Sequence, residues 1–264
     1  WRTRMSAMQR FQEKMLPAMF AGTKYANCFP IGTMDVVMNF KPQTLRDYYE
    51  KWYRPDLQGI VVVGDIDVDA IEALIKKRFS DIPAQPNAAK REYYPVNDNQ
   101  EPIVLVARDK EQPYVQTFIF NKHQATPREE KNNVGYLMQD YAVTLITNML
   151  NARLNELLQV ANPPYIYATT YDDDFFVAKT KDAFTGIVVC KEDNIEEGIS
   201  TILREIERAR QFGFTETEYS RARAEYLRHL ESAFQERDKR KNESYVKEYV
   251  RHFLDNEPIP GIAN

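Results

Sequence analysis

The sequence predicts an α+β fold, in which an antiparallel-rich sheet has helices packed on one face. Apolar runs of strand length come in adjacent pairs after residue 102, and the longer helical patterns are grouped rather than inserted between single strands. This segregation is typical of α+β domains and argues against a doubly wound parallel sheet. The length of 264 residues suits one to two domains.

The first part of the chain is predicted to contain two helical stretches that are separated by a turn. A helical stretch runs from Trp1 to about Met19, and Pro30 to Gly32 form a Pro-Ile-Gly turn, in which proline presets one backbone angle. A helix from about Gln43 to Tyr53 follows and ends at Arg54-Pro55, since the residue before a proline is pushed out of the helical region. Its apolar residues share one face at helical spacing: Leu45, Tyr48, Tyr49 and Trp52.

Gly59 to Gly64 is an uninterrupted apolar run and predicts a short strand buried on both faces. Asp67 then caps a second helix, whose apolar face carries Ile71, Leu74, Ile75 and Phe79. A strand-Gly-Asp-helix segment can bind a dinucleotide, but this one lacks the later glycines that let a backbone approach a pyrophosphate. We therefore predict no dinucleotide site.

Residues 83–102 are rich in proline, asparagine and charge and show no apolar period, so they predict a linker. The predicted second domain, 103–264, starts with strands Ile103 to Arg108 and Tyr114 to Phe120 in a hairpin. An amphipathic segment follows from Val134 to Leu158, where Asn148 and Asn151 mark a break between two helices. Tyr165 to Tyr171 and Ala183 to Cys190 supply two further strands.

Three helices are predicted to finish the chain. The first runs from about Asn194 to Phe212, with Gly213 as a left-handed cap. Thr215 and Glu218 form a capping box that opens the second helix, and the third runs from about Ser244 to Leu254.

Composition excludes several classes of function. A net charge of −4 argues against a nucleic-acid backbone as partner, because such binding rests on a basic surface. No apolar stretch approaches the roughly 20 residues that span a bilayer. Cys28 and Cys190 are far apart and outside any C-x-x-C pair, so two buried thiols are favoured over a disulfide.

The sequence predicts no catalytic, metal-binding or cofactor-binding residue. Its three histidines, His123, His229 and His252, are scattered, whereas zinc needs protein ligands that converge at about 2 Å. Asp172-Asp173-Asp174 lacks the spacing and glycine of a calcium loop and is interpreted as a solvated turn. The basic run Arg237 to Lys241 is interpreted as an interhelix loop, because glutamates nearby dilute its charge.

The ordered motifs resemble the pitrilysin/insulinase family of zinc metallopeptidases. They are the Pro-Ile-Gly turn, the Leu-x-x-Tyr-Tyr-x-x-Trp-Tyr-x-Pro helix that ends at Pro55, and the Val-Val-Val-Gly-Asp-Ile segment Val61 to Ile66. Met149 to Leu154, Phe212 to Glu218 and Glu257 to Gly261 are similar to later family segments. The resemblance covers nearly all of the chain. It implies that 1–82 is the C-terminal part of a zinc-carrying first domain and that 103–264 is a second, non-catalytic domain.

The family's chemistry uses an inverted zinc motif, H-x-x-E-H, in which two histidines bind the metal and the glutamate activates water. This motif is absent from the sequence, so no catalytic position can be carried over. Either the chain is a fragment cut downstream of the motif or it is a catalytically dead relative. The opening Trp1 to Met5, which has neither an initiating methionine nor a helix cap, favours the fragment.

Three functions follow as hypotheses. The first is a non-catalytic, chamber-forming part of a peptidase that hydrolyses peptides with zinc held elsewhere in the parent. The second is an inactive scaffold or subunit, and the third is a peptide-binding α+β module that uses a sheet edge. The expected partners are the remainder of the same polypeptide and peptide substrates in the parent. The isolated chain is expected either to form a homodimer through residues 1–40 or to leave them poorly ordered. The resemblance favours a periplasmic or cell-envelope location.

Overall fold

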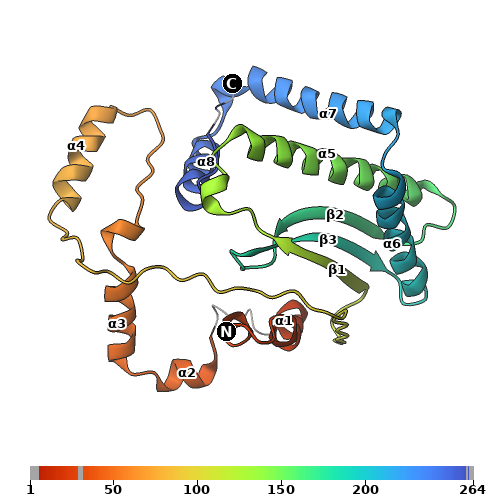
Figure 1. Ribbon diagram of the computed structural model, residues 1–264, viewed down its shortest axis with the longest axis horizontal. Coiled ribbons are helices and arrows are strands. Elements are labelled where there is room, and N and C mark those ends of the chain that lie inside the picture. Colours follow the sequence, from red (N-terminus) through yellow and green to blue (C-terminus); the bar gives the residue numbers. More distant parts are fainter. Residues whose placement is uncertain (1–5, 29–31, 260, 262–264) are drawn as a thin grey trace. The chain divides into compact units, whose positions relative to one another are not determined.

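The structure, a computed structural model, describes residues 6–28, 32–259 and 261, which form two compact units. Unit one holds the described residues of Trp1–Phe29, Tyr93–Pro127 and Val134–Ser232. Unit two holds those of Pro30–Glu92, Arg128–Asn133 and Ala233–Asn264. Figure 1 labels the elements of both units along the chain. The domain boundaries predicted from the sequence stay a prediction.

The centre of unit one is a three-stranded antiparallel sheet in the order β1-β3-β2. Its strands are β1 (Val115–Gln124), β2 (Tyr167–Asp174) and β3 (Lys181–Cys190). β3 pairs with both neighbours, for example Ile187 with Phe118 of β1 and with Thr169 of β2. The α+β fold class with an antiparallel sheet is thus confirmed.

The predicted first strand of the hairpin, Ile103 to Arg108, is wrong. These residues are extended but pair with no strand within the described ranges, and Val104 and Val106 are 81% and 82% exposed. The adjoining turn does form, with Gln112 N donating to Asp109 O at 3.2 Å. The segment has the sequence pattern of a strand, but no neighbouring strand pairs with it among the described residues, and its valine side chains are exposed to water.

Helices α5 (Val134–Glu156) and α6 (Ile195–Phe212) pack on the sheet in unit one (Figure 1). The contact is a cluster of side chains that are at most 3% exposed: Leu154, Tyr165, Ala168, Val188, Cys190 and Ile202. Gly198 makes close packing of α6 possible, because a Cβ there would lie 2.2 Å from Cys190 Sγ. The apolar residues that share one face of α6 therefore form part of the core of unit one.

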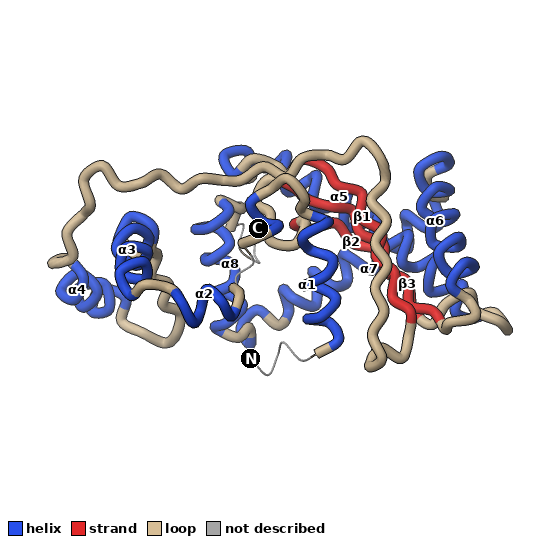
Figure 2. Tube along the Cα trace, turned by 90° about the horizontal axis from the view of Figure 1, so that it is seen from below, coloured by secondary structure: helices blue, strands red, loops and turns tan. Residues whose placement is uncertain are grey.

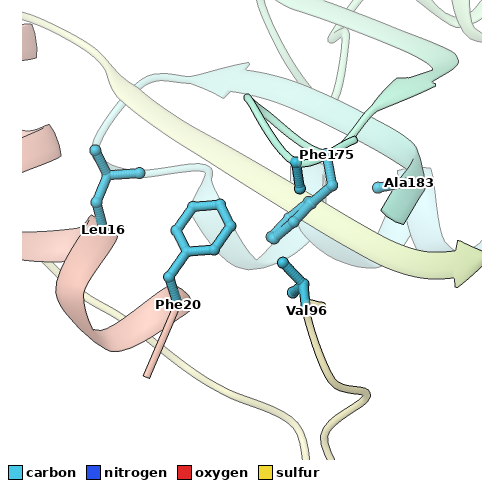
Figure 3. Packing of buried hydrophobic residues seen from close by; sticks show 6 residues of the cluster. Leu16, Phe20, Val96, Phe175 and Ala183 are labelled. Atoms are coloured by element: carbon cyan, nitrogen blue, oxygen red, sulfur yellow. The ribbon is translucent and has the colours of Figure 1, made fainter. Parts of the chain in front are cut away.

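Helix α1 (Ala7–Met19) covers part of the other sheet face. Its first turn is capped by Ser6, whose Oγ accepts from Gln9 N at 3.3 Å. Figure 3 shows Phe20 facing Phe175 and Val96, with Ala183 of β3 nearby. Ala183 and Val188 are five residues apart on one strand, so their side chains lie on opposite faces. Residues 1–5 of the predicted helical stretch lie outside the described residues.

α5 runs unbroken through Asn148 and Asn151, so the predicted helix break is wrong. Instead of ending the helix, the Asn151 amide bonds the backbone of β2. Its Oδ1 accepts from Thr170 N at 2.7 Å, and its Nδ2 donates to Thr170 O at 2.9 Å. The asparagine thus ties α5 to the strand beneath it.

Helix α6 ends at Phe212, and α7 (Glu216–Gln235) begins at the capping box, as the sequence predicts. Thr215 Oγ1 accepts from Glu218 N at 3.3 Å, and Glu218 Oε2 accepts from Thr215 N at 2.7 Å, which confirms the capping box. Gly213 has φ 68° and ψ −147°, a positive-φ conformation that glycine adopts without strain. Its ψ differs from that of the left-handed cap that was predicted.

Unit two consists of short helices: α2 (Met34–Asn39), α3 (Pro42–Trp52), α4 (Val68–Phe79) and α8 (Asn242–Asp255). Asp67 caps α4 as predicted, accepting from Ala70 N at 3.0 Å. Arg128 donates to Phe253 O and Leu254 O, each at 3.0 Å, and so satisfies carbonyls at the end of α8. The turn residues Pro30 and Ile31 lie outside the described part of the chain.

The predicted buried strand Gly59 to Gly64 is wrong. Figure 2 draws the segment between α3 and α4 as loop, and Ile60 and Val62 are 52% and 47% exposed. No strand pairs with it among the residues that the structure describes. The apolar face of α3 is open as well, with Tyr48 57% and Tyr49 60% exposed.

Short 3-10 turns connect several of these elements: Lys24–Ala26, Pro55–Leu57, Arg128–Glu130, Leu157–Gln159 and Arg237–Lys239. Among the described helices, none has the length and apolar character needed to cross a bilayer.

Candidate functional site

The three histidines are not grouped with other metal-ligating side chains in the described part of the chain. His123 Nε2 lies 2.9 Å from Asp172 Oδ1, and His252 Nδ1 lies 2.7 Å from Glu257 O. His229 is exposed on α7, as predicted. In the described ranges, no three His, Cys, Asp or Glu side chains are grouped so that they could hold a metal ion. These residues therefore do not fit the family's zinc site, and no catalytic step is derived from them.

The acidic run Asp172 to Asp174 is the end of β2, so its interpretation as a turn is wrong. Asp172 faces His123, and Asp174 pairs with Lys179 across the hairpin at 3.2 Å. The basic run lies between α7 and α8 and includes the turn Arg237–Lys239, which confirms an interhelix loop.

The two cysteines are both free thiols. Cys190 is buried in the core of unit one, and burial raises its pKa. Cys28 is exposed, so the prediction of burial holds for one cysteine and is wrong for the other.

Arg153 forms a largely enclosed ion pair in unit one, with side-chain exposures of 9% for Arg153 and 25% for Glu218. Arg153 as a whole residue is 8% exposed, and its Nε and Nη2 donate to the Glu218 carboxylate at 2.5 and 2.9 Å. Nη2 also reaches Gly213 O at 3.0 Å, and the guanidinium lies 4.5 Å from the centre of the Phe214 ring. Hydrogen bonds from Arg153 lower the pKa of Glu218 to about 2. One side chain of α5 thus fixes the turn between α6 and α7.

A surface groove of about 460 Å³ lies between the segment after α5 and the start of α6. Its walls combine apolar and polar side chains. They are Leu157, Val160, Asn162, Pro163, Pro164, Asn194, Glu197, Thr201, Arg204 and Glu205. Asn194 Nδ2 donates to Pro164 O at 3.0 Å, which ties the loop to the start of α6. The groove is therefore a built feature of unit one.

Glu205 is the groove residue that sequence reasoning missed. It is 8% exposed although it carries a carboxylate, and Arg208 Nη1 donates to its Oε2 at a long 3.4 Å. Burial, followed by the charge of Glu205, raises the pKa of Tyr165 to about 12. The pKa of Arg153 is raised mainly by its hydrogen bonds to Glu218, and the charge of Glu205 adds to that shift. Its position beside Ile202 and Ile206 in the sequence of α6 could have indicated that Glu205 lies on the inner face of the helix.

By its fold the chain is an α+β domain with helices stacked on a small antiparallel sheet. A family model described as the Peptidase M16 inactive domain matches residues 39–226. The chain belongs to this family, and the predicted membership of the pitrilysin/insulinase peptidases is confirmed.

Curated relatives are similar over nearly the whole chain. A protein named "Zinc protease PQQL-like" from Arabidopsis thaliana is 27% identical over 99% of this chain, which covers 24% of that relative. "Probable zinc protease PqqL" of Escherichia coli K12 is 25% identical over 98% of this chain, covering 27% of its length. The chain thus spans about a quarter of the relatives that it matches.

Solved structures share the fold. The periplasmic protease PqqL from Escherichia coli has a TM-score of 0.88 at 23% identity, over 100% of this chain and 28% of that one. The first half of that protease gives 0.87, with 55% of its chain covered. A predicted insulinase family protease from Yersinia pestis gives 0.71 at 17% identity, over 98% of this chain and 53% of that one.

Proposed function

We propose that this chain is a non-catalytic, chamber-forming part of a zinc-dependent peptidase, and that the zinc-binding residues belong to another part of the parent polypeptide. The match to the Peptidase M16 inactive domain is the observation that carries the proposal. Relatives named as zinc proteases are about four times as long, which leaves room in such a parent for the catalytic residues.

The exposed apolar surface of unit two supports the same proposal. Tyr48 and Tyr49 of α3 and Val62 carry a pattern typical of buried residues, yet all three are about half exposed or more. Apolar surface of this kind marks a contact with another chain or segment. We propose that the remainder of the same polypeptide covers it, and that residues 1–82, 83–102 and 103–264 are the end of the first domain, a linker and the second domain.

The test is a longer polypeptide that includes the residues ahead of Trp1, compared with the 264-residue chain. We expect the longer form to bind zinc and to cleave peptides in a chelator-sensitive reaction, and the short form to do neither. A zinc ion bound by the short chain alone would contradict the proposal.

A second candidate is an inactive scaffold or subunit of the same family. The upstream residues separate the two candidates: an H-x-x-E-H motif there favours the peptidase, and its absence favours the scaffold. A third candidate is a peptide-binding module that uses the outer edge of β1. It predicts that a peptide pairs with Val115–Gln124 in the absence of any catalytic partner.

Two further expectations concern partners and location. We propose that the isolated chain self-associates through residues 1–40, where Met8 and Met38 are 50% and 72% exposed; a monomer at high concentration in analytical ultracentrifugation would contradict this. We also propose a periplasmic location, supported by the solved periplasmic protease from Escherichia coli. Fractionation of cells that express the full-length parent tests this location.

A further inference from the structure

We infer that the groove between the segment after α5 and the start of α6 binds the basic side chain of a peptide, a lysine or an arginine. Glu205 supplies the acidic floor of this site. The inference concerns binding by unit one and goes beyond the chamber-forming role proposed above. It rests on three properties of the groove: its size, its mixed lining and a carboxylate in that lining with one long hydrogen bond.

The size and lining suit one long side chain with part of its backbone. Small-ligand sites typically have volumes of about 300 to 1,000 Å³, and the groove measures about 460 Å³. Leu157, Val160 and Pro164 offer apolar walls. Lysine and arginine bury their methylene stems against such walls while their charged ends reach polar groups.

The Glu205 carboxylate accepts one long hydrogen bond among the described residues. An ionised carboxylate offers about four acceptor positions, and a buried charge is stable only when it is paired and hydrogen-bonded. Glu205 is 8% exposed, and its single hydrogen bond among the described residues is the long contact to Arg208, whose side chain is 58% exposed. A cation in the groove supplies further donors.

Acidic side chains outnumber basic ones in the lining itself. Glu197 and Glu205 carry two carboxylates and Arg204 one guanidinium, while Arg208 pairs with Glu205 from outside the lining through a side chain that is 58% exposed. The Thr201 hydroxyl donates to Glu197 Oε1 at 3.2 Å and so positions that carboxylate in the lining of the groove. With a net charge of −4, the chain as a whole also attracts cations.

An alternative role for Glu205 is to neutralise the charge of Arg153. Arg153 Nη1 is buried and has no hydrogen-bond partner in the described part of the chain, and the charge of Glu205 acts on Arg153. If Glu205 served only to neutralise Arg153, its loss would lower stability without any change in ligand binding. The experiment therefore measures binding and stability separately.

The test is an NMR titration of the isotope-labelled 264-residue chain with N-acetyl-arginine amide and N-acetyl-lysine amide. N-acetyl-norleucine amide is the uncharged probe. We expect shifts of amide signals around Val160, Asn194 and Thr201 with one or both basic probes. Glu205→Gln should weaken their binding about tenfold, since a hydrogen bond to a charged group is removed.

Two variants separate the groove from general charge effects. Glu196→Gln removes the same charge from an exposed position on α6 outside the groove lining and should leave binding unchanged. Val160→Trp keeps Glu205 but fills the groove from a position that is 49% exposed, and it should abolish binding. Equal binding by wild type and Glu205→Gln, equal binding of the norleucine probe, or the absence of binding would each overturn the inference.

Discussion

Lys181–Cys190 and Gly59–Gly64 are both short apolar segments, but they have different environments. The first is β3, the central strand of unit one, with Val188 fully buried between β1 and β2. The second is a loop of unit two, in which Val62 is 47% exposed. Both contain an Ile-Val-Val run, at 187–189 and at 60–62. The difference is that β3 has neighbouring strands on both sides within the chain, whereas Gly59–Gly64 pairs with no strand among the described residues.

This contrast shows that strand propensity depends on burial and on neighbours that accept the backbone hydrogen bonds. In unit one, β1 and β2 supply the hydrogen-bonding neighbours of β3, and α5 and α6 bury one face of the sheet. In unit two, we propose that another part of the parent polypeptide supplies the neighbours of Gly59–Gly64. The following predictions test this contrast.

The largest effect is expected for Ile202→Ala in the core of unit one. Ile202 is fully buried against the sheet, so truncation should lower the free energy of unfolding by about 2 to 5 kcal/mol. Its neighbour Leu203 is 44% exposed on the same helix, and Leu203→Ala is the matched control. Urea unfolding of both variants measures the difference. Equal losses would show that α6 is not packed as described.

Val188→Ala tests β3 itself. The residue is fully buried in the sheet, and loss of two methyl groups should cost about 2 kcal/mol of unfolding free energy. Urea unfolding monitored by circular dichroism provides the value. If Val188→Ala lowered the free energy of unfolding as little as truncation of an exposed valine does, β3 and Gly59–Gly64 would not differ in burial as described.

Acid should weaken the link that Arg153 makes to the turn after α6. The pKa of Glu218 is lowered to about 2 in the folded chain from an ordinary 4.5, so the stabilisation is present above about pH 4.5 and is lost as the pH falls toward 2. We expect Glu218→Gln to remove about 1.5 kcal/mol of this acid-dependent stability. Unfolding curves at pH 7 and pH 3 test it, with Glu216→Gln as the control. An identical pH dependence in wild type and Glu218→Gln would contradict the prediction.

The smallest effect is expected for Val62→Ala in this chain. The side chain is about half exposed, so the change in unfolding free energy should stay within about 0.5 kcal/mol. In the longer polypeptide proposed above, the same substitution should cost as much as Val188→Ala. A small cost in both forms would show that no further part of the parent covers this segment.

Much of unit one was predictable from local patterns. The strands that became β2 and β3 and the helix that became α6 were found from their apolar spacing, and the α7 cap from Thr215 and Glu218. The errors have physical causes. Ile103–Arg108 and Gly59–Gly64 carry strand propensity without a bonded neighbour, and Asn151 uses its amide on β2 instead of ending α5.

The groove was less predictable than the fold. Glu205 lies on the inner face of α6, and the sequence alone did not show that its carboxylate has few donors. The lining combines residues from the loop after α5 with residues of α6, which are more than 30 positions apart. Such a site depends on how two segments approach each other, and spacing along one helix cannot report it.

Asn151 also limits how the sheet can grow. Its amide occupies both backbone polar groups of Thr170, the groups through which β2 would otherwise recruit a foreign strand. Unprotected edges of this kind are where proteins begin to aggregate. One asparagine on α5 therefore makes the backbone groups of Thr170 unavailable to a further strand on the β2 side of the sheet.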